Sequence, residues 1–203
     1  MTNLIIISSV NDLPNETDLV NKLFENGLEL FHLRKPEMKE AEQKQYLEKI
    51  NPAHLNKISI HQHHSMANEF ELKYLHFKES FRNSFLFDKA KKNNYTVSTS
   101  YHSHNDPYVA NEKYDYCFLG PVYNSISKKG YDQKINEDVK IKQEKVSTKI
   151  FALGGITTSN TEPLLKRGFS GIAVLGSIWQ EPNKCIESFN QFQKLCQVSA
   201  PSF

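Results

Sequence analysis

Two glycine-bearing segments toward the carboxyl end of the chain have residue types suited to binding an anion. Residues 152–156 read Ala-Leu-Gly-Gly-Ile, and residues 173–177 read Ala-Val-Leu-Gly-Ser. Glycine lets the backbone approach an anion closely and aim its N–H groups at the oxygens, and a short helical turn after the second segment would add further amide donors. The predicted phosphate-binding residues are Gly154, Gly155, Gly176 and Ser177.

A polar loop after the apolar run at 116–119 carries a second set of candidate ligand contacts. Ser125 and Ser127 place two hydroxyls two residues apart, and Lys128 follows at once. In isolation, a Ser/Lys-rich stretch is typical of a solvated loop. Next to the predicted phosphate segments, however, these side chains can donate hydrogen bonds and positive charge to an anionic ligand.

Short apolar runs alternate with amphipathic segments along the whole chain, at a period near one eighth of its length. Several of these runs are continuously apolar, which is typical of strands covered on both faces in a parallel sheet. The predicted strands are Leu4–Ser8, Glu29–Arg34, Lys57–His61, Tyr74–Phe77, Tyr95–Ser100, Tyr116–Leu119, Lys149–Leu153 and Gly171–Leu175.

The intervening segments have the spacing of helices. Apolar residues recur on one face at Val20, Leu23 and Phe24, and again from Cys185 to Cys196, and the spacing at Ser159–Glu162 predicts a helix start. Eight strands alternating with helices fit either a closed barrel or a doubly wound open sheet. The count favours an α/β fold of the (β/α)8 TIM-barrel type, a single domain over residues 1–203, with phosphate bound after strands seven and eight.

Composition and charge exclude several classes of function. Lys and Arg number 25 against 23 Asp and Glu, so the net charge of +2 provides no broad field for nucleic acid. The apolar run in residues 1–8 is too short to span a membrane and follows no basic leader, so we expect no membrane association. Three cysteines without C-x-x-C spacing indicate reduced thiols and a cytoplasmic location. The sequence leaves open whether the chain forms a homo-oligomer.

The segments that carry these residues resemble the thiamine-phosphate synthase and TenI (thiazole tautomerase) superfamily. Residues 119–123 (Leu-Gly-Pro-Val-Tyr), with Ser125, Ser127 and Lys128 behind them, resemble the family's Leu-Gly-Pro-Val/Ile-Phe followed by Thr-x-Thr-Lys. The resemblance covers nearly the whole chain in order and is strongest from Tyr116 to Trp179. It implies a barrel that binds a thiazole phosphate.

Three further motifs extend the resemblance. Residues 152–156 match the family's Ala-x-Gly-Gly-Ile, and residues 171–178 match Gly-x-Ala-Val-x-x-x-Ile. Arg34 matches the arginine of Gln-x-Arg-x-Lys on strand two, and Ser100 with His102 resembles Ser-x-His after strand five. For the synthase, the resemblance implies coupling of thiazole phosphate to hydroxymethylpyrimidine pyrophosphate, with pyrophosphate released and Mg²⁺ as cofactor.

The pyrophosphate and metal half of the implied site departs from the family pattern. The two metal-binding aspartates are replaced by Gln62 and Phe81, and Glu79 is out of register. Pro36 stands in place of the pyrophosphate-binding lysine, and Lys35 is one residue early, which on a strand turns a side chain to the opposite face. We therefore expect Mg²⁺ only if the chain is a synthase.

Two alternatives to the synthase stay open. A TenI-like tautomerase moves a proton on the thiazole carboxylate phosphate without metal, but Pro121 stands where its histidine would be. A substitute base would be needed, and histidines near strand ends titrate near neutral pH. The second alternative is a non-catalytic paralogue that binds thiazole or thiamine phosphate. The candidate bases are His32, His61, His76 and His102.

The predicted site combines these assignments. The spacing His61-x-His63-His64 also suggests zinc, but neither Cys nor Asp is placed as a third ligand, so we predict no metal site there. The predicted ligands are small phosphorylated substrates. The candidate catalytic residues are Arg34, His102 and Lys128, and the candidate substrate-binding residues are His32, Lys35, His61, His76, Ser100, Ser125, Ser127, Gly154, Gly155, Gly176 and Ser177.

Overall fold

Eight parallel strands close into a barrel, in the order in which they occur along the chain. The structure is a computed structural model that describes residues 3–82, 84–109, 113–124 and 135–198. The barrel closes where β8 pairs with β1, with Ile5 opposite Ala173. The strands are β1 (Leu4–Ile7), β2 (Phe31–Leu33), β3 (Ile58–Ile60), β4 (Tyr74–Phe77), β5 (Thr96–Tyr101), β6 (Tyr116–Leu119), β7 (Lys149–Leu153) and β8 (Gly171–Val174).

The predicted (β/α)8 barrel is confirmed, and every predicted strand is present. The bounds of β4, β6 and β7 match the prediction, while β2 is shorter by several residues and β5 is shifted by one. The two short strands lose predicted end residues because the pairing between β2 and β3 covers only three residues of each. The polar residues beyond these pairs stay free to project from the ends of the strands.

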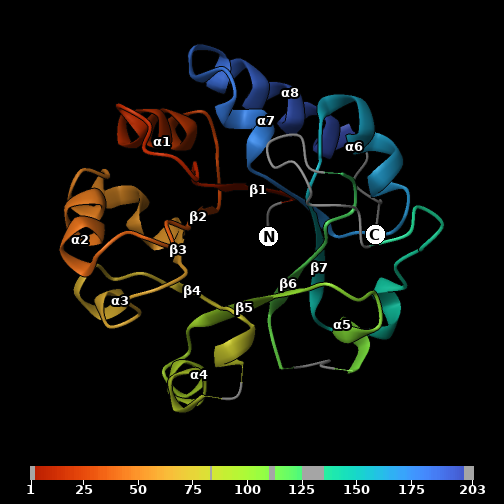
Figure 1. Cartoon of the computed structure of the whole chain (residues 1–203), viewed down its shortest axis with the longest axis horizontal. Helices are drawn as coiled ribbons and strands as arrows, with labels where there is room; N and C mark the ends of the chain where they lie inside the picture. Colours follow the sequence, from red (N-terminus) through yellow and green to blue (C-terminus); the bar gives the residue numbers. More distant parts are fainter. Residues whose placement is uncertain (1–2, 83, 110–112, 125–134, 199–203) are drawn as a thin grey trace.

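Helices and short turns surround the barrel in Figure 1. The buried faces of α1 and α8 are the predicted ones, with Val20, Leu23 and Phe24 on the first and Cys185 and Phe189 on the second. The principal helices are α1 (Glu16–Glu25), α2 (Glu40–Glu48), α3 (Met66–Glu69), α4 (Phe85–Lys92), α5 (Asp106–Val109), α6 (Thr158–Leu165), α7 (Gly176–Trp179) and α8 (Cys185–Val198).

The helix predicted to start at Ser159–Glu162 starts slightly earlier. In α6 the N-cap is Thr157, and its backbone N–H donates to Oδ1 of Asn160 at 2.8 Å. Asn160 therefore takes the capping role that the spacing had assigned to Glu162, because a short amide side chain accepts from the same kind of free N–H group.

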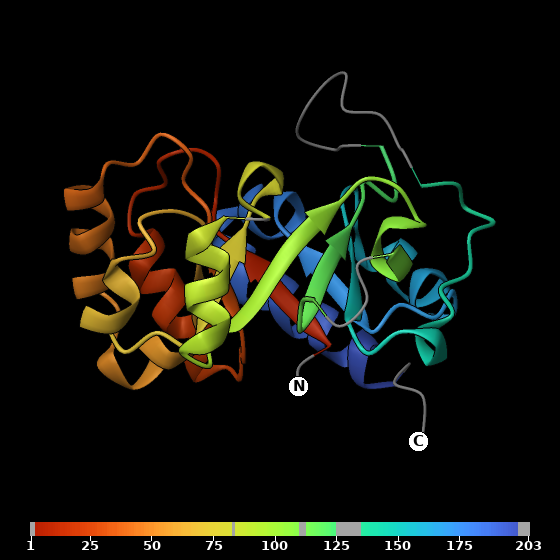
Figure 2. The same ribbon diagram turned by 90° about the horizontal axis from the view of Figure 1, so that it is seen from below.

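Two layers of side chains arise from the alternation along each strand. One set packs outward against the helices, for example Cys117 and Leu119. The other set fills the barrel interior, for example Tyr116, Phe118 and Phe151. Figure 2 shows β5 and β6 running side by side in one direction, so their carboxyl ends open at the same end of the barrel. Ligand sites of such barrels are built at this end.

Nothing in the described part of the chain forms a helix with the length and apolar character needed to cross a membrane. The three cysteines, Cys117, Cys185 and Cys196, are all buried and free of disulfides. They pack as small apolar side chains, and burial raises the pKa of Cys185 and of Cys196 to about 12, so neither is a reactive thiolate at neutral pH.

Candidate functional site

A cavity of about 540 Å³ opens at the carboxyl ends of the strands. It is large enough for a small phosphorylated heterocycle, since ligand pockets commonly have about 300 to 1,000 Å³. Its wall combines apolar side chains with imidazoles and cations. The lining residues include Ile7, Arg34, His61, Gln62, His76, Lys78, Glu79, Ser100, His102, Phe118, Gly154, Gly155, Ile156, Gly176 and Ser177.

The loops after β7 and β8 form the part of the wall that was predicted to bind phosphate. Gly154 and Gly155 both have positive φ, 99° and 65°, a region that side chains other than glycine disfavour. Across the gap, Ser177 Oγ donates to the carbonyl oxygen of Ile156 at 2.5 Å, which ties the two loops together. All four predicted phosphate-binding residues line the cavity. Their backbone N–H groups therefore come from two neighbouring strand ends.

Replacing Gly155 with alanine is expected to weaken phosphate binding by roughly tenfold or more, because forcing a side chain into such a φ/ψ region costs about 1–3 kcal/mol. The new Cβ would also overlap the backbone oxygen of Asn124. Calorimetric titration with inorganic phosphate measures the effect. Gly27→Ala is the matched control, since its φ is also positive, at 96°, but its Cβ would meet only the side chain of Gln193. Equal affinities in both variants would contradict the assignment.

Three histidines from neighbouring strands meet at the base of the cavity. His32 Nδ1 lies 2.9 Å from His61 Nε2, and His32 Nε2 lies 2.8 Å from the hydroxyl of Tyr116. His76 stacks on His61 with ring centroids 4.0 Å apart. The predicted histidines therefore form two layers: His61 and His76 line the cavity, and His32 is fully buried behind them.

Hydroxyl groups hold the ring of His76 in place. Its Nδ1 lies 2.9 Å from Ser98 Oγ, and its Nε2 lies 3.2 Å from Ser100 Oγ. Ser100 lines the cavity, while Ser98 is fully buried. Sequence reasoning missed Ser98 and Tyr116 as partners of the histidines. An inward polar side chain within a barrel strand was the available signal, since this layer is ordinarily filled by branched apolar residues.

These three imidazoles are neutral at physiological pH. Burial, together with the charges of neighbouring His64, Arg34 and Arg82, lowers the pKa of His76 to about 3. Burial likewise lowers the pKa of His32 and of His61 well below the ordinary value, with His76 as the next contributor in each case. The low dielectric of the barrel disfavours an imidazolium, so each ring keeps one lone pair and one N–H.

His102 takes a different position, at the rim of the cavity after β5. Its Nδ1 lies 2.7 Å from the carbonyl oxygen of Gly120, so Nδ1 carries a proton and donates to that oxygen. In the neutral ring the other nitrogen, Nε2, is then a proton acceptor. Gly120 directly precedes Pro121, so an imidazole reaches the end of β6 from the neighbouring strand. This arrangement suits a general base.

Two cations, Arg34 and Lys78, belong to the cavity lining. Arg34 is held through its backbone, because Ser8 Oγ accepts from its N–H at 2.8 Å and donates to its carbonyl oxygen at 3.0 Å. Lys78, which sequence reasoning did not single out, also lines the cavity. It directly follows β4, and a cation just after a predicted strand was the signal that could have identified it.

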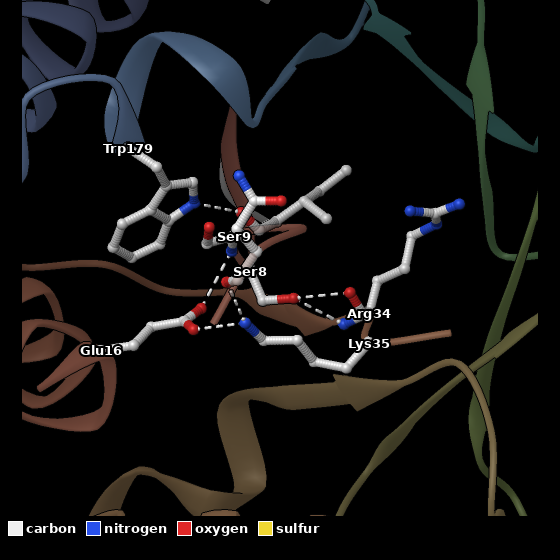
Figure 3. A network of polar contacts seen from close by, with 8 residues as sticks. Ser8, Ser9, Glu16, Arg34, Lys35 and Trp179 are labelled. Atoms are coloured by element: carbon white, nitrogen blue, oxygen red, sulfur yellow. Dashed lines mark hydrogen bonds and ion pairs between the residues drawn. The ribbon is translucent and has the colours of Figure 1, made fainter. Parts of the chain in front are cut away.

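Lys35 does not line the cavity. Its Nζ lies 2.6 Å from Glu16 Oε2 and donates to the carbonyl oxygen of Asn11 at 2.9 Å, and Figure 3 shows it directed away from the side chain of Arg34. Both Lys35 and Glu16 are buried. The physical reason is the offset of one residue, which sends the side chain of Lys35 to the side of the strand end opposite that of Arg34.

The loop residues Ser125, Ser127 and Lys128 lie outside the described residues. The structure ends on one side of them at Asn124 and resumes at Ile135. The backbone of Val122 and Tyr123 is bonded to the strand-seven end, at Leu153 and Gly154, so the chain enters this loop beside the cavity. Their contacts with a ligand remain predictions.

The donors at the cavity do not fit Mg²⁺. This ion prefers carboxylate and water oxygens in octahedral geometry. Gln62 instead donates its amide N–H groups to the carbonyl oxygens of Lys35 and Met38. Among the described lining residues Glu79 is the one carboxylate, and its side chain is 76% exposed and pairs with Arg82 at 3.5 Å.

The fold defines a barrel of the (β/α)8 class, with a cavity at the carboxyl ends of its strands. Residues 4–178 match the family model for thiamine monophosphate synthase, so the chain belongs to that family. Among curated relatives, the thiamine-phosphate synthase of Helicobacter pylori is 37% identical over 73 residues, which are 35% of this chain and 33% of the relative. That of Geobacillus kaustophilus is 30% identical over 71 residues, 34% of this chain and 32% of the relative. These matches span about a third of each relative's length.

Solved structures resemble the chain over almost all of its length. Thiamine phosphate pyrophosphorylase from Bacteroides thetaiotaomicron has a TM-score of 0.78 at 27% identity, covering 97% of this chain and 98% of that one. The enzyme of the same name from Pyrococcus furiosus also has a TM-score of 0.78, with 98% and 97% covered, but at 17% identity it supports the fold alone. Family and fold are therefore established together.

Proposed function

We propose that this chain binds a thiazole phosphate and catalyses a proton transfer on it that does not require Mg²⁺. The observation that carries the proposal is the position of His102, with Nδ1 bonded to Gly120 and Nε2 left as the acceptor at the cavity rim. Membership of the thiamine monophosphate synthase family supports the substrate class. The lack of a carboxylate pair among the described lining residues favours a reaction that expels no pyrophosphate.

The proposed roles follow from the positions of the residues around the cavity. The phosphate would accept hydrogen bonds from the loops of Gly154 and Gly155 and from the N-terminus of α7, at Gly176 and Ser177. Arg34, which also lines the cavity, would hold a second anionic group such as a carboxylate. Ser125, Ser127 and Lys128 would donate hydrogen bonds and positive charge to the substrate.

The reaction is an isomerisation, so no group leaves. His102 Nε2 would remove a proton from one ring position of the thiazole, and the resulting imidazolium would return a proton to another. The loop amides and Arg34 orient the ring, and the buried face of Phe118 beside the histidines excludes water from it. The neutral rings of His61 and His76, at the base of the cavity, would form hydrogen bonds with the bound thiazole.

Replacing His102 with glutamine is expected to lower turnover of the thiazole carboxylate phosphate by about 10²–10⁴-fold, the usual contribution of a general base. Deuterium exchange and isomer formation, followed by proton NMR in the presence of EDTA, measure it. His104→Gln is the control, since His104 is exposed, lies two residues away and is not part of the lining. A His102→Gln variant with full activity would overturn the proposed base.

The synthase reaction is the second candidate, favoured by the family match and by Arg34 in the cavity wall. Purified protein supplied with thiazole phosphate and pyrimidine pyrophosphate, with and without Mg²⁺, separates the two candidates. Thiamine phosphate formed only with Mg²⁺ would replace the tautomerase by a synthase. Binding of thiazole phosphate without either product would instead identify a non-catalytic binding protein.

A further inference from the structure

Three histidine side chains, two of them buried and His61 half-buried, lie close enough together to share one metal ion. His32, His61 and His76 each offer a ring nitrogen, and these three atoms lie within 4.8 Å of one another. They come from β2, from the residue after β3 and from β4, so they are neighbours around the barrel. A rigid sheet therefore sets the spacing of their backbones.

His32 and His76 each have a buried hydroxyl next to one ring nitrogen, and Nε2 of His76 also lies 3.2 Å from Ser100 Oγ, which an ion would displace. The nitrogen of His32 that does not face His61 lies 2.8 Å from Tyr116 Oη, and Nδ1 of His76 lies 2.9 Å from Ser98 Oγ. Histidines that bind metals almost always use their second nitrogen in this way, which fixes the tautomer and the orientation of the ring. The hydroxyls of Tyr116 and Ser98 are therefore placed to act as such second partners.

We propose that His32, His61 and His76 form a site for a divalent transition-metal ion, of which Zn²⁺ is the natural case, at the base of the cavity. Imidazole nitrogen suits Zn²⁺, Ni²⁺ and Cu²⁺, whereas Mg²⁺ prefers oxygen. Three protein nitrogens leave one tetrahedral position open, as in catalytic zinc sites. His61 and His76 line the cavity, so the open position faces the space for a ligand.

The alternative is a network of neutral imidazoles without metal, and the geometry separates the two states. In the structure His32 Nδ1 and His61 Nε2 are 2.9 Å apart and share one proton, while His61 and His76 are stacked within 20° of parallel. An ion would replace that shared proton, and His61 would have to rotate out of the stack so that its lone pair points to the ion. Binding therefore requires the ring that carries the shared proton, His32 or His61, to move it to its other nitrogen.

The ionisation state of the cluster already suits a metal. Burial holds the pKa of all three rings below its ordinary value, so protons do not compete with an ion at neutral pH. The site requires neither the thiazole substrate nor His102, so it is independent of the proposed proton transfer. Failure of one proposal leaves the other standing.

The test uses the full chain without an affinity tag, treated with EDTA and then titrated with Co²⁺. We expect one equivalent to produce the visible absorption bands of four- or five-coordinate cobalt, and Zn²⁺ to displace it. His61→Ala should weaken cobalt binding by at least 100-fold. His63→Asn is the control, because His63 belongs to the same loop but contacts the carbonyl oxygen of Met38, and asparagine tolerates its φ of 50°.

A second measurement on the unaltered protein guards against misfolding of the His61 variant. In long-range nitrogen–proton NMR spectra, one equivalent of Zn²⁺ should shift the bonded ring nitrogens of His32, His61 and His76 and leave those of His63 and His102 in place. The proposal would be overturned if the unaltered protein bound Co²⁺ no more tightly than the His61→Ala variant does. It would also be overturned if Zn²⁺ did not shift the nitrogens of the three rings, and the hydrogen-bonded network without metal would then stand.

Discussion

Replacing Lys35 with methionine is expected to destabilise the folded chain by about 3–5 kcal/mol, because it leaves the Glu16 carboxylate buried without its partner. The two side chains are 6% and 4% exposed, and their charged atoms are 2.6 Å apart. Burial already raises the pKa of Glu16 above its ordinary value, even though Lys35 opposes that shift. Urea denaturation followed by circular dichroism measures the change in the free energy of unfolding.

The exposed ion pair Lys44–Glu69 is the matched control. Its charged atoms are also 2.6 Å apart, but its side chains are 46% and 52% exposed. Lys44→Met should change stability far less, because water screens and solvates an exposed pair. The double variant Glu16→Gln/Lys35→Met should recover much of the loss, since no buried charge remains unpaired. A Lys35→Met protein as stable as Lys44→Met would show that Lys35 is not a buried structural cation.

Lowering the pH from about 7.5 to 5.5 is expected to cost the metal-free chain about 4 kcal/mol of unfolding free energy, from three histidines at about 1.4 kcal/mol each. The ordinary pKa of each in the unfolded chain is 6.5, and burial holds the folded values well below it. Below a pH of about 6.5, these histidines are protonated in the unfolded chain but stay neutral in the folded chain. The stabilisation is therefore complete above about 6.5 and is lost as the pH falls.

Urea denaturation in EDTA at a series of pH values measures this dependence. The neighbouring cations reinforce it, since Arg34 opposes protonation of His61 and of His76, and Arg82 opposes that of His76. His61→Asn removes one of the three groups and should flatten the dependence by about a third. A stability that is independent of pH over this range would mean that the folded and unfolded chains bind the same number of protons, so that the fold does not hold these rings neutral.

The eight strands and the glycine loops were predictable because their signals are local. A continuously apolar run such as 4–7 must be covered on both faces, and the regular spacing of such runs indicated eight strands. Positions 154, 155 and 176 were informative because glycine is the residue that allows an anion close to the backbone. Motif order along the chain supplied the family resemblance, which the match over residues 4–178 confirms.

The polar half of the site was decided by the tertiary structure. The sequence grouped His61 with His63 and His64, but the barrel groups it with His32 and His76, because parallel strands bring together residues 15 to 29 positions apart. Likewise, the consecutive residues Arg34 and Lys35 point to opposite sides, so that Arg34 lines the cavity and Lys35 pairs with Glu16. Local patterns determine which residues form strands, whereas the register and closure of the sheet determine which side chains meet, since that depends on neighbours that the chain order does not specify.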